Sequence, residues 1–227
     1  LDIAVCVVGY NRPDSVKRLL ASLMNAEYMG RRVKLYISID KSQDDSVSKV
    51  ADEYEWPYGE KTVILHENNL GLRKHILSCG NLLNNHDAIV VLEDDVVVSP
   101  SFYIYAVQCV DKYIDNDEIA GISLYSFIMN HHNHLTFWPM KTDSDVYLMQ
   151  FAQSWGQVWM KNQWNDFMKW YSSNSDDNFE MGPHLPDSIG TWPKSSWLKY
   201  HIRYCVENDK YFVLIYVCFL PTKIPSE

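Results

Sequence analysis

The sequence predicts an α/β fold with a mainly parallel sheet flanked by helices. Over the first hundred residues, short runs rich in β-branched apolar residues alternate with segments whose apolar positions recur at helical spacing. The strand-like runs also end in polar residues, as expected where an open sheet brings side chains to one edge. Strand–helix alternation of this kind favours right-handed βαβ units, in which neighbouring strands run parallel.

The first strand is expected over 3–10, where IAVCVVGY runs into the turn sequence NRP. Asp14 or Ser15 is expected to cap the helix that follows. The apolar positions of this helix recur at i, i+3, i+4 and i+7 and are Val16, Leu19, Leu20 and Leu23. The segment therefore predicts an amphipathic helix with one buried face.

The same alternation continues to residue 98. VKLYISID (33–40) predicts a second strand, and the polar loop KSQDDS leads from it to a helix at about 46–55. KTVILHE (61–67) predicts a third strand and NNLGLRKHILSCGNLL the helix after it. AIVVLEDDVVV (88–98) predicts a fourth strand region. The polar residues expected at the four strand ends are Tyr10–Arg12, Asp40, Glu67–Asn69 and Glu93–Asp95.

The second half differs from the first in amino-acid composition. Of the 8 Trp residues, only Trp56 precedes Pro100, and Ser, Asn, Asp and His become frequent. YFVLIYVCFL (211–220) predicts a buried strand or core segment, because it is about half of the ~20 residues that a spanning helix needs. We expect a single domain over 1–227, in which 1–98 binds a nucleotide and 99–227 holds a second substrate.

Charge and cysteine content exclude several classes of protein. The net charge of −9 argues against nucleic acid or an anionic membrane as the main partner. The 5 Cys residues are widely spread and form no C-x-x-C pair, which predicts reduced, buried thiols and neither a disulfide framework nor a zinc site. The chain starts at Leu1 on a strand-like run, so we expect it to be a piece of a longer protein.

The triplet Glu93, Asp94 and Asp95 lies between two apolar runs. Buried like charges are unfavourable unless they are paired or bind a metal, so the triplet predicts a cation or several hydrogen-bond donors. Carboxylate oxygens suit Mg²⁺ or Mn²⁺, which keep open positions for substrate phosphates. The alternatives are a solvated turn between two strands and a phosphohydrolase Asp-x-Asp motif. The latter fits poorly, because its first position is a glutamate here and a match starting at Asp94 would need an acid at Val96.

Together with its neighbours, the triplet resembles the Glu-Asp-Asp version of the Asp-x-Asp motif in GT-A glycosyltransferases. The resemblance is strongest to inverting enzymes of the N-acetylglucosaminyltransferase I type and to family-2-like enzymes. It covers most of 1–220 and follows the order of the segments. These segments are VVGYNRPDSVKRLLASL, LYISID, NLGLRKHI, LEDDVVVSPSFYIY, SWGQVWMKNQW and WPKSSWLKYHIRYCVENDKYF.

The resemblance implies a role for each strand end. Asp95 would bind the metal directly, while Glu93 and Asp94 would hold the ribose or the donor sugar. Asp40 would accept a hydrogen bond from the base, and Arg12 would contact the phosphates. The donor-binding set implied by the resemblance is Tyr10, Asn11, Arg12, Asp40, Arg73, Lys74, Glu93, Asp94 and Asp95.

Several of these residues also have a structural interpretation. Arg12 and Asp40 could be ordinary turn residues. Arg73 and Lys74 could form a solvated helix face instead of adding positive charge near the diphosphate.

An inverting transfer needs a carboxylate to accept the proton of the acceptor hydroxyl. The N-acetylglucosaminyltransferase I pattern places acids just after WPK-x-x-W, where this chain has Leu198-Lys199-Tyr200. The candidates that remain are Asp187, Glu180, Asp176 and Asp177, and Asp187 is preferred because it lies just upstream of WPKSSW.

Tryptophan offers a flat apolar face to a sugar ring, so Trp155 and Trp197 are predicted to bind the acceptor. Trp159 and Trp164 are expected to lie in the core. The cluster of His131, His132 and His134 lacks a helical i, i+4 pair and nearby acids, and predicts a polar loop rather than a metal site.

These observations predict a metal-dependent transferase that uses Mn²⁺ or Mg²⁺. Its donor would be a nucleotide-sugar, with uridine diphosphate as the expected nucleotide, and its acceptor a glycan or a lipid-linked sugar. Transfer would invert the anomeric centre. The alternative is a non-catalytic nucleotide- or glycan-binding module of the same fold. No nucleic-acid partner and no transmembrane segment are expected.

Overall fold

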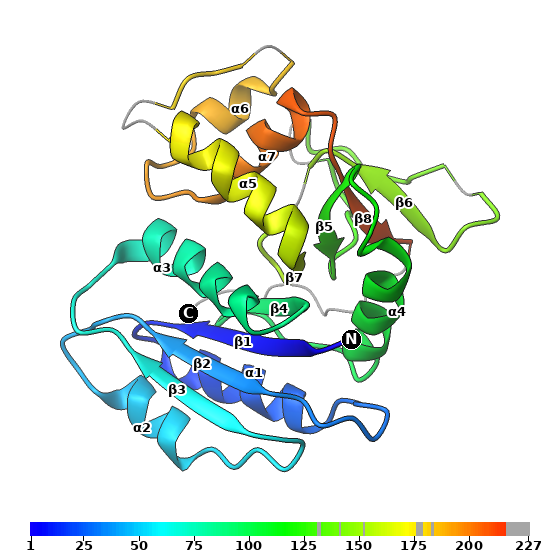
Figure 1. The fold of residues 1–227 in the computed structure, drawn as a ribbon. Helices are drawn as coiled ribbons and strands as arrows, with labels where there is room; N and C mark the ends of the chain where they lie inside the picture. The colour runs from blue at the N-terminus through cyan, green and yellow to red at the C-terminus, as the bar shows by residue number, and fades with distance from the viewer. Residues whose placement is uncertain (131–132, 141, 152, 176–178, 183, 217–227) are drawn as a thin grey trace.

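The computed structural model describes residues 1–216 apart from 131–132, 141, 152, 176–178 and 183 (Figure 1). The first half alternates strands and helices as the sequence predicts. Its elements are β1 (Ile3–Gly9), α1 (Pro13–Met24), β2 (Leu35–Ile39), α2 (Ser46–Glu53), β3 (Lys61–Leu65), α3 (Gly71–Cys79), the 3₁₀ helix η1 (Gly80–Asn84) and β4 (Ala88–Glu93).

The described residues of the second half add four strands and four helices. These are α4 (Phe102–Tyr113), β5 (Ile119–Ser123), β6 (Val146–Met149), β7 (Gln157–Met160), α5 (Lys161–Asn174), α6 (Asp187–Gly190), α7 (Leu198–Glu207) and β8 (Tyr211–Ile215). The predicted strand at 211–220 is confirmed as β8, and residues 217–220 lie outside the described part. None of the helices in that part has the length and apolarity that a bilayer crossing needs.

The eight strands of the described chain belong to one sheet, in the order β3-β2-β1-β4-β7-β5-β8-β6. The strands β3, β2, β1 and β4 run parallel to one another, as predicted. Beyond β4 the sheet is mixed, because β7 runs antiparallel to both β4 and β5, and β6 runs antiparallel to β8. In Figure 1, α1 and α2 lie on one face of the parallel strands, while α3 and α5 lie on the other.

Two boundaries differ from the sequence prediction. Helix α1 starts at Pro13, and no side chain caps it, so the cap expected at Asp14 or Ser15 is wrong. Proline suits this first helical position because its fixed φ is already helical and its missing N–H is not needed there. Strand β4 ends at Glu93, not at 98, because the amide of Val96 turns back to bond the carbonyl of Glu93 at 3.3 Å.

The core explains the length of the apolar runs. Every residue of β1 is buried, because a parallel strand is covered on both faces. The rings of Trp159 and Trp164 stack with centroids 3.8 Å apart, and both side chains are buried, which confirms their predicted place in the core. The four Cys residues of the described chain are buried free thiols, as predicted, and Cys218 lies outside it.

Candidate functional site

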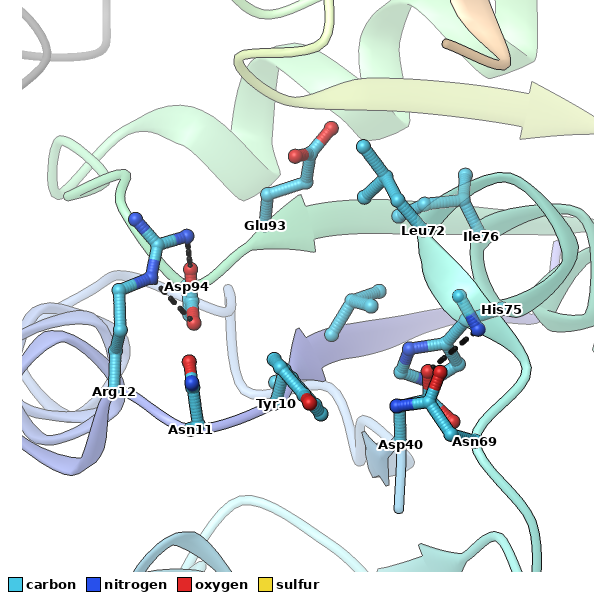
Figure 2. Close-up of a pocket in the computed structure, with 13 residues that line it drawn as sticks. Tyr10, Asn11, Arg12, Asp40, Asn69, Leu72, His75, Ile76, Glu93 and Asp94 are labelled. Carbon is cyan, nitrogen blue, oxygen red and sulfur yellow. Dashed lines mark hydrogen bonds and ion pairs between the residues drawn. The ribbon is translucent and has the colours of Figure 1, made fainter. Parts of the chain in front are cut away.

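A cleft of about 410 Å³ lies at the carboxyl ends of β1, β2 and β4. Open α/β sheets place their ligands at this edge, where neighbouring strand ends leave a crevice. Figure 2 shows Arg12 and Asp94 at one end of the cleft, Asp40 and Asn69 at the other, and Tyr10 between them. The residues lining the cleft are Val8, Gly9, Tyr10, Asn11, Arg12, Asp40, Asn69, Gly71, Leu72, His75, Ile76, Glu93 and Asp94.

At the first end, Arg12 and Asp94 form a two-bond ion pair. Nε of Arg12 donates to Oδ2 of Asp94 at 3.2 Å, and Nη2 donates to Oδ1. Nη1 of the same guanidinium lies 3.7 Å from Oδ2 of Asp95. Arg12 is therefore bound to the acidic motif, while its side chain still lines the cleft and is 43% exposed.

Burial dominates the chemistry of Asp94. Its side chain is 5% exposed, and this desolvation raises its pKa to about 6. Arg12 opposes the rise, and the charge of Asp95 adds to it. The turn after β4 thus concentrates negative charge, and Arg12 contacts both of its aspartates.

At the opposite end of the cleft, Asp40 follows β2 and is 4% exposed. One carboxylate oxygen accepts from the amides of Lys41 and Leu70, at 2.9 and 2.8 Å. The other accepts from the amide of Gly71 at 2.9 Å. Gly71 has φ +72°, in the left-handed region that glycine tolerates. Asp40 therefore holds the chain where it turns into α3, and its carboxylate also faces the cleft.

His75 is a cleft residue that the sequence prediction missed. It lies on α3 and its Nε2 is 2.8 Å from Oγ of Ser38, which also lies 3.2 Å from Nε2 of His66. Burial lowers the pKa of His75 to about 4, so its ring is neutral at pH 7. His75 lies three residues after Leu72 and one before Ile76, and this helical spacing indicates that the three side chains share one face of α3.

The two basic residues predicted on α3 do not line this cleft. Arg73 is half-buried and donates from Nη1 to the hydroxyl of Tyr200 on α7 at 2.8 Å. Lys74 is exposed. Glu93 is half-buried and lines the cleft beside Asp94 (Figure 2).

The predicted acceptor residues lie elsewhere in the second half. Trp155 is half-buried and packs edge-on against Tyr125, with ring centroids 4.5 Å apart. Trp197 is 3% exposed and packs against Trp159, so in this structure its ring belongs to the core and offers no face to a ligand.

Among the predicted bases, Asp187 is the first residue of α6, is exposed and does not line the cleft. Glu180 is also exposed. Asp176 and Asp177 lie outside the described residues, as do His131 and His132 of the histidine cluster, while His134 is exposed.

The donor set of the acidic motif fits a hard divalent cation. No group of three or more His, Cys, Asp or Glu side chains that could hold a metal occurs among the described residues. Mg²⁺ and related ions are often held by only one or two carboxylates together with substrate phosphates. In this structure Arg12 bonds both oxygens of Asp94 and also approaches Asp95.

An open α/β sheet with a polar cleft at its strand ends defines a Rossmann-like ligand-binding fold. The family described as glycosyltransferase like family 2 matches residues 2–161, so the chain belongs to that family. No curated protein is similar enough in sequence to match this chain.

Solved glycosyltransferase structures share this fold, which is GT-A. S. aureus TarS 1–349 in complex with UDP-GlcNAc has a TM-score of 0.60 at 13% identity, over 100% of this chain and 60% of that chain. GalNAc-T7 with UDP, GalNAc and Mn²⁺ has a TM-score of 0.62 at 14% identity, over 95% and 42%. Mannosyltransferase PcManGT from Pyrobaculum calidifontis, in complex with GDP-Man and Mn²⁺, has a TM-score of 0.54 at 11% identity, over 95% and 56%. This chain thus spans 60% or less of these three chains, and at such identities the likeness concerns the fold.

Proposed function

We propose that the chain transfers a sugar from a nucleotide-sugar to a hydroxyl group of a glycan or lipid-linked acceptor, with Mn²⁺ or Mg²⁺ as cofactor. The observation that carries this proposal is the cleft itself, which has a buried, amide-bound carboxylate at one end and the Arg12–Asp94 pair at the other. Asp95 does not line the cleft and lies beside this pair, with Oδ2 3.7 Å from Nη1 of Arg12. Family membership and the ligands named for the matched structures support a nucleotide-sugar as the occupant of the cleft.

Within this proposal, Asp40 accepts a hydrogen bond from the base and Tyr10 and Asn11 lie along the nucleoside. Glu93 and Asp94 hold the ribose or the donor sugar. Asp95 is the metal ligand, and Arg12 fixes the two aspartates in position. When bound, the metal would stabilise the negative charge that develops on the departing diphosphate. Uridine diphosphate is the proposed nucleotide, and inversion the proposed stereochemical course.

The same proposal assigns proton removal to Asp187. It follows Pro186, which lines a small apolar groove with Phe127 and Phe151 in the second half. An acceptor lying along this groove would bring its hydroxyl near the start of α6. Trp155 is proposed to contact the same acceptor.

Titration of UDP with Mn²⁺ into wild-type protein and the Asp95→Asn variant tests the donor assignment. The variant should bind UDP at least tenfold more weakly, because loss of a charged ligand removes about 1.5–3 kcal/mol. Asp14→Asn is the matched control, since Asp14 is 83% exposed on α1. Equal affinity for UDP in Asp95→Asn and the wild type would refute the assignment.

A non-catalytic nucleotide- or glycan-binding module is the second candidate function. One observation favours it: the first turn of α7 carries Leu198, Lys199 and Tyr200 where related enzymes of the N-acetylglucosaminyltransferase I type are expected to have acids. Incubation with UDP-sugars and Mn²⁺ separates the two functions. Release of UDP above the rate of a buffer blank, with loss in Asp95→Asn, supports the enzyme, and binding without release supports the module.

A further inference from the structure

The first turns of α3 and α7 meet beside the cleft. Arg73 of α3 donates a hydrogen bond to the hydroxyl of Tyr200, and its guanidinium carbon lies 5.2 Å from the centre of the Tyr200 ring. Arg73 directly follows Gly71 and Leu72, which line the cleft. A cationic group from the nucleotide-binding half is thus held against the half that carries α7.

Lys199 places a second cation at this junction. The residue is 3% exposed, and its Nζ donates to the carbonyl of Pro193 at 3.3 Å. The ammonium also lies 4.9 Å from the ring centre of Phe179 and 5.7 Å from that of Tyr200. A lysine has three N–H donors, so one carbonyl and two ring faces leave its charge weakly compensated.

These cations have no acidic partner in the part of the chain that the structure describes. Within the described part of the chain, no carboxylate oxygen lies within 4.0 Å of Arg73, Lys194 or Lys199. Burial lowers the pKa of Lys199, and the charges of Arg73 and Lys194 lower it further. Charged groups are rarely buried without a partner, because desolvation of an unpaired charge is unfavourable. The nearby Arg203 differs, since it pairs with Glu207 at 2.6 Å.

We propose that Arg73 and Lys199, with Lys194 at the edge, bind a phosphate or diphosphate group at a site separate from the donor cleft. A phosphate group offers several acceptor oxygens. The planar guanidinium of an arginine can donate two parallel hydrogen bonds to them, and a neighbouring lysine ammonium adds a compact positive charge. Because α7 belongs to the second half, the group is carried by the acceptor, such as a sugar phosphate or a lipid diphosphate. This assignment of the acceptor rests on the proposed function, whereas the anion site itself does not.

Calorimetric titration with pyrophosphate, in EDTA and without nucleotide, tests the site. Wild-type protein should bind pyrophosphate, and Lys199→Met and Arg73→Gln should each bind it at least tenfold more weakly, because each removes a charge-assisted contact worth about 1.5–3 kcal/mol. Lys169→Gln is the matched control, because Lys169 is an exposed lysine on α5. Absence of pyrophosphate binding to the wild type, or equal binding by both variants, would overturn the proposal.

Thermal unfolding separates a ligand site from a purely structural role. Pyrophosphate should raise the Tm of the wild type clearly more than that of Lys199→Met, because a ligand stabilises the folded state according to its affinity for it. Without pyrophosphate, Lys199→Met should be at least as stable as the wild type, since methionine removes a buried charge that lies near the like charge of Arg73. A large drop in Tm for Lys199→Met alone would show that the ammonium is structural and would contradict the proposal.

A parallel titration with UDP and Mn²⁺ identifies the source of the phosphate. Unchanged UDP affinity in Lys199→Met and Arg73→Gln places the anion site outside the donor cleft, as proposed. A tenfold loss of UDP affinity in both variants would assign the cations to the donor diphosphate and refute a separate site. Failure of the proposed function is a different result, in which UDP does not bind while pyrophosphate still does.

Discussion

Arg12 and Asp94 join two turns that lie 82 residues apart in the chain. Arg12 follows β1 and Asp94 follows β4, and these strands are parallel neighbours in the sheet. The pair therefore fixes the two loops that form one end of the cleft. Because Arg12 also approaches Asp95, one side chain orients both aspartates of the acidic motif.

The first prediction concerns this pair. Arg12→Met should lower the free energy of unfolding by about 1–2 kcal/mol, because a charge-assisted bond to a buried carboxylate is lost while the exposure of Arg12 screens part of the effect. It should also weaken UDP binding in Mn²⁺ about tenfold, since Arg12 no longer orients the side chains of the two aspartates. Urea denaturation and calorimetry measure the two effects.

Lys17→Met is the control for Arg12→Met, because Lys17 is 61% exposed and its nearest acid lies 3.6 Å away. It should change neither quantity. The double variant Arg12→Met/Asp94→Asn should recover part of the lost stability, since the buried carboxylate no longer lacks a partner. Additive losses in this double-mutant cycle would show that the pair contributes no coupling.

The second prediction separates two roles of Asp40. Asp40→Asn should lower the free energy of unfolding by about 1–3 kcal/mol. The side-chain NH₂ group of asparagine would face a backbone N–H group whose hydrogen bond the carboxylate now accepts. If Asp40 also contacts the base, uridine affinity should fall as well. Urea denaturation and titration with uridine report on the two roles separately.

Asp45→Asn is the matched control for Asp40, since Asp45 lies in the same loop, is 70% exposed and pairs only with Lys49 among the contacts described for it. It should leave uridine affinity unchanged. Loss of stability in Asp40→Asn with no change in uridine affinity would make Asp40 a purely structural residue.

Local patterns in the sequence were sufficient for much of the first half. The β-branched runs predicted β1 to β4, and helical spacing predicted the buried face of α1. The end of β4 was missed because Val96 and Val98 are buried although they follow a turn, so their apolarity reads as a continued strand. The antiparallel insertion of β7 between β4 and β5 was also missed, since pairing between distant strands leaves no local pattern.

The site divides in the same way. Polar residues at strand ends predicted that Arg12, Asp40, Glu93 and Asp94 would meet in one cleft, and they do. The partners of these side chains could not be predicted, because the Arg12–Asp94 bonds and the turn of Arg73 toward Tyr200 depend on how the helices pack. Residue type alone could not place Trp197, which is buried. An aromatic ring packs equally well against a sugar and in a hydrophobic core, so its presence does not distinguish the two.

The third prediction concerns the proposed general base. Asp187→Asn should lower kcat by ~10²–10⁴-fold with unchanged UDP affinity, as expected when a base is removed and donor binding is not. Steady-state kinetics on the acceptor that supports transfer, together with UDP titration, measure this split. Glu180→Gln is the comparison, since Glu180 is also exposed in the same region. A full loss of kcat in Glu180→Gln and none in Asp187→Asn would transfer the role.

The last prediction concerns His201, which is 1% exposed and stacks on Phe167 with ring centroids 4.2 Å apart. Neither of its ring nitrogens has a hydrogen-bond partner among the described residues.

Burial lowers the pKa of His201 from the usual 6.5 to about 3. The folded protein therefore keeps this ring neutral, while the unfolded chain takes up a proton below pH 6.5. Stability from this group is therefore complete above pH 6.5 and is lost as the pH falls toward 3. Between pH 7 and pH 5 the free energy of unfolding should fall by about 2 kcal/mol, at 1.36 kcal/mol per pH unit below 6.5.

The variant His201→Phe tests this prediction because it removes the titrating group. It should lose about 2 kcal/mol less than the wild type over that interval. It should also be at least as stable at pH 7, because the unpaired ring nitrogens are gone. The remaining acid sensitivity includes His75, whose pKa is lowered in the same direction to about 4. Urea denaturation at both pH values measures the difference, with His134→Asn, at an exposed histidine, as the control that should follow the wild type. Equal losses in His201→Phe and the wild type would mean that His201 does not remain neutral in the folded protein.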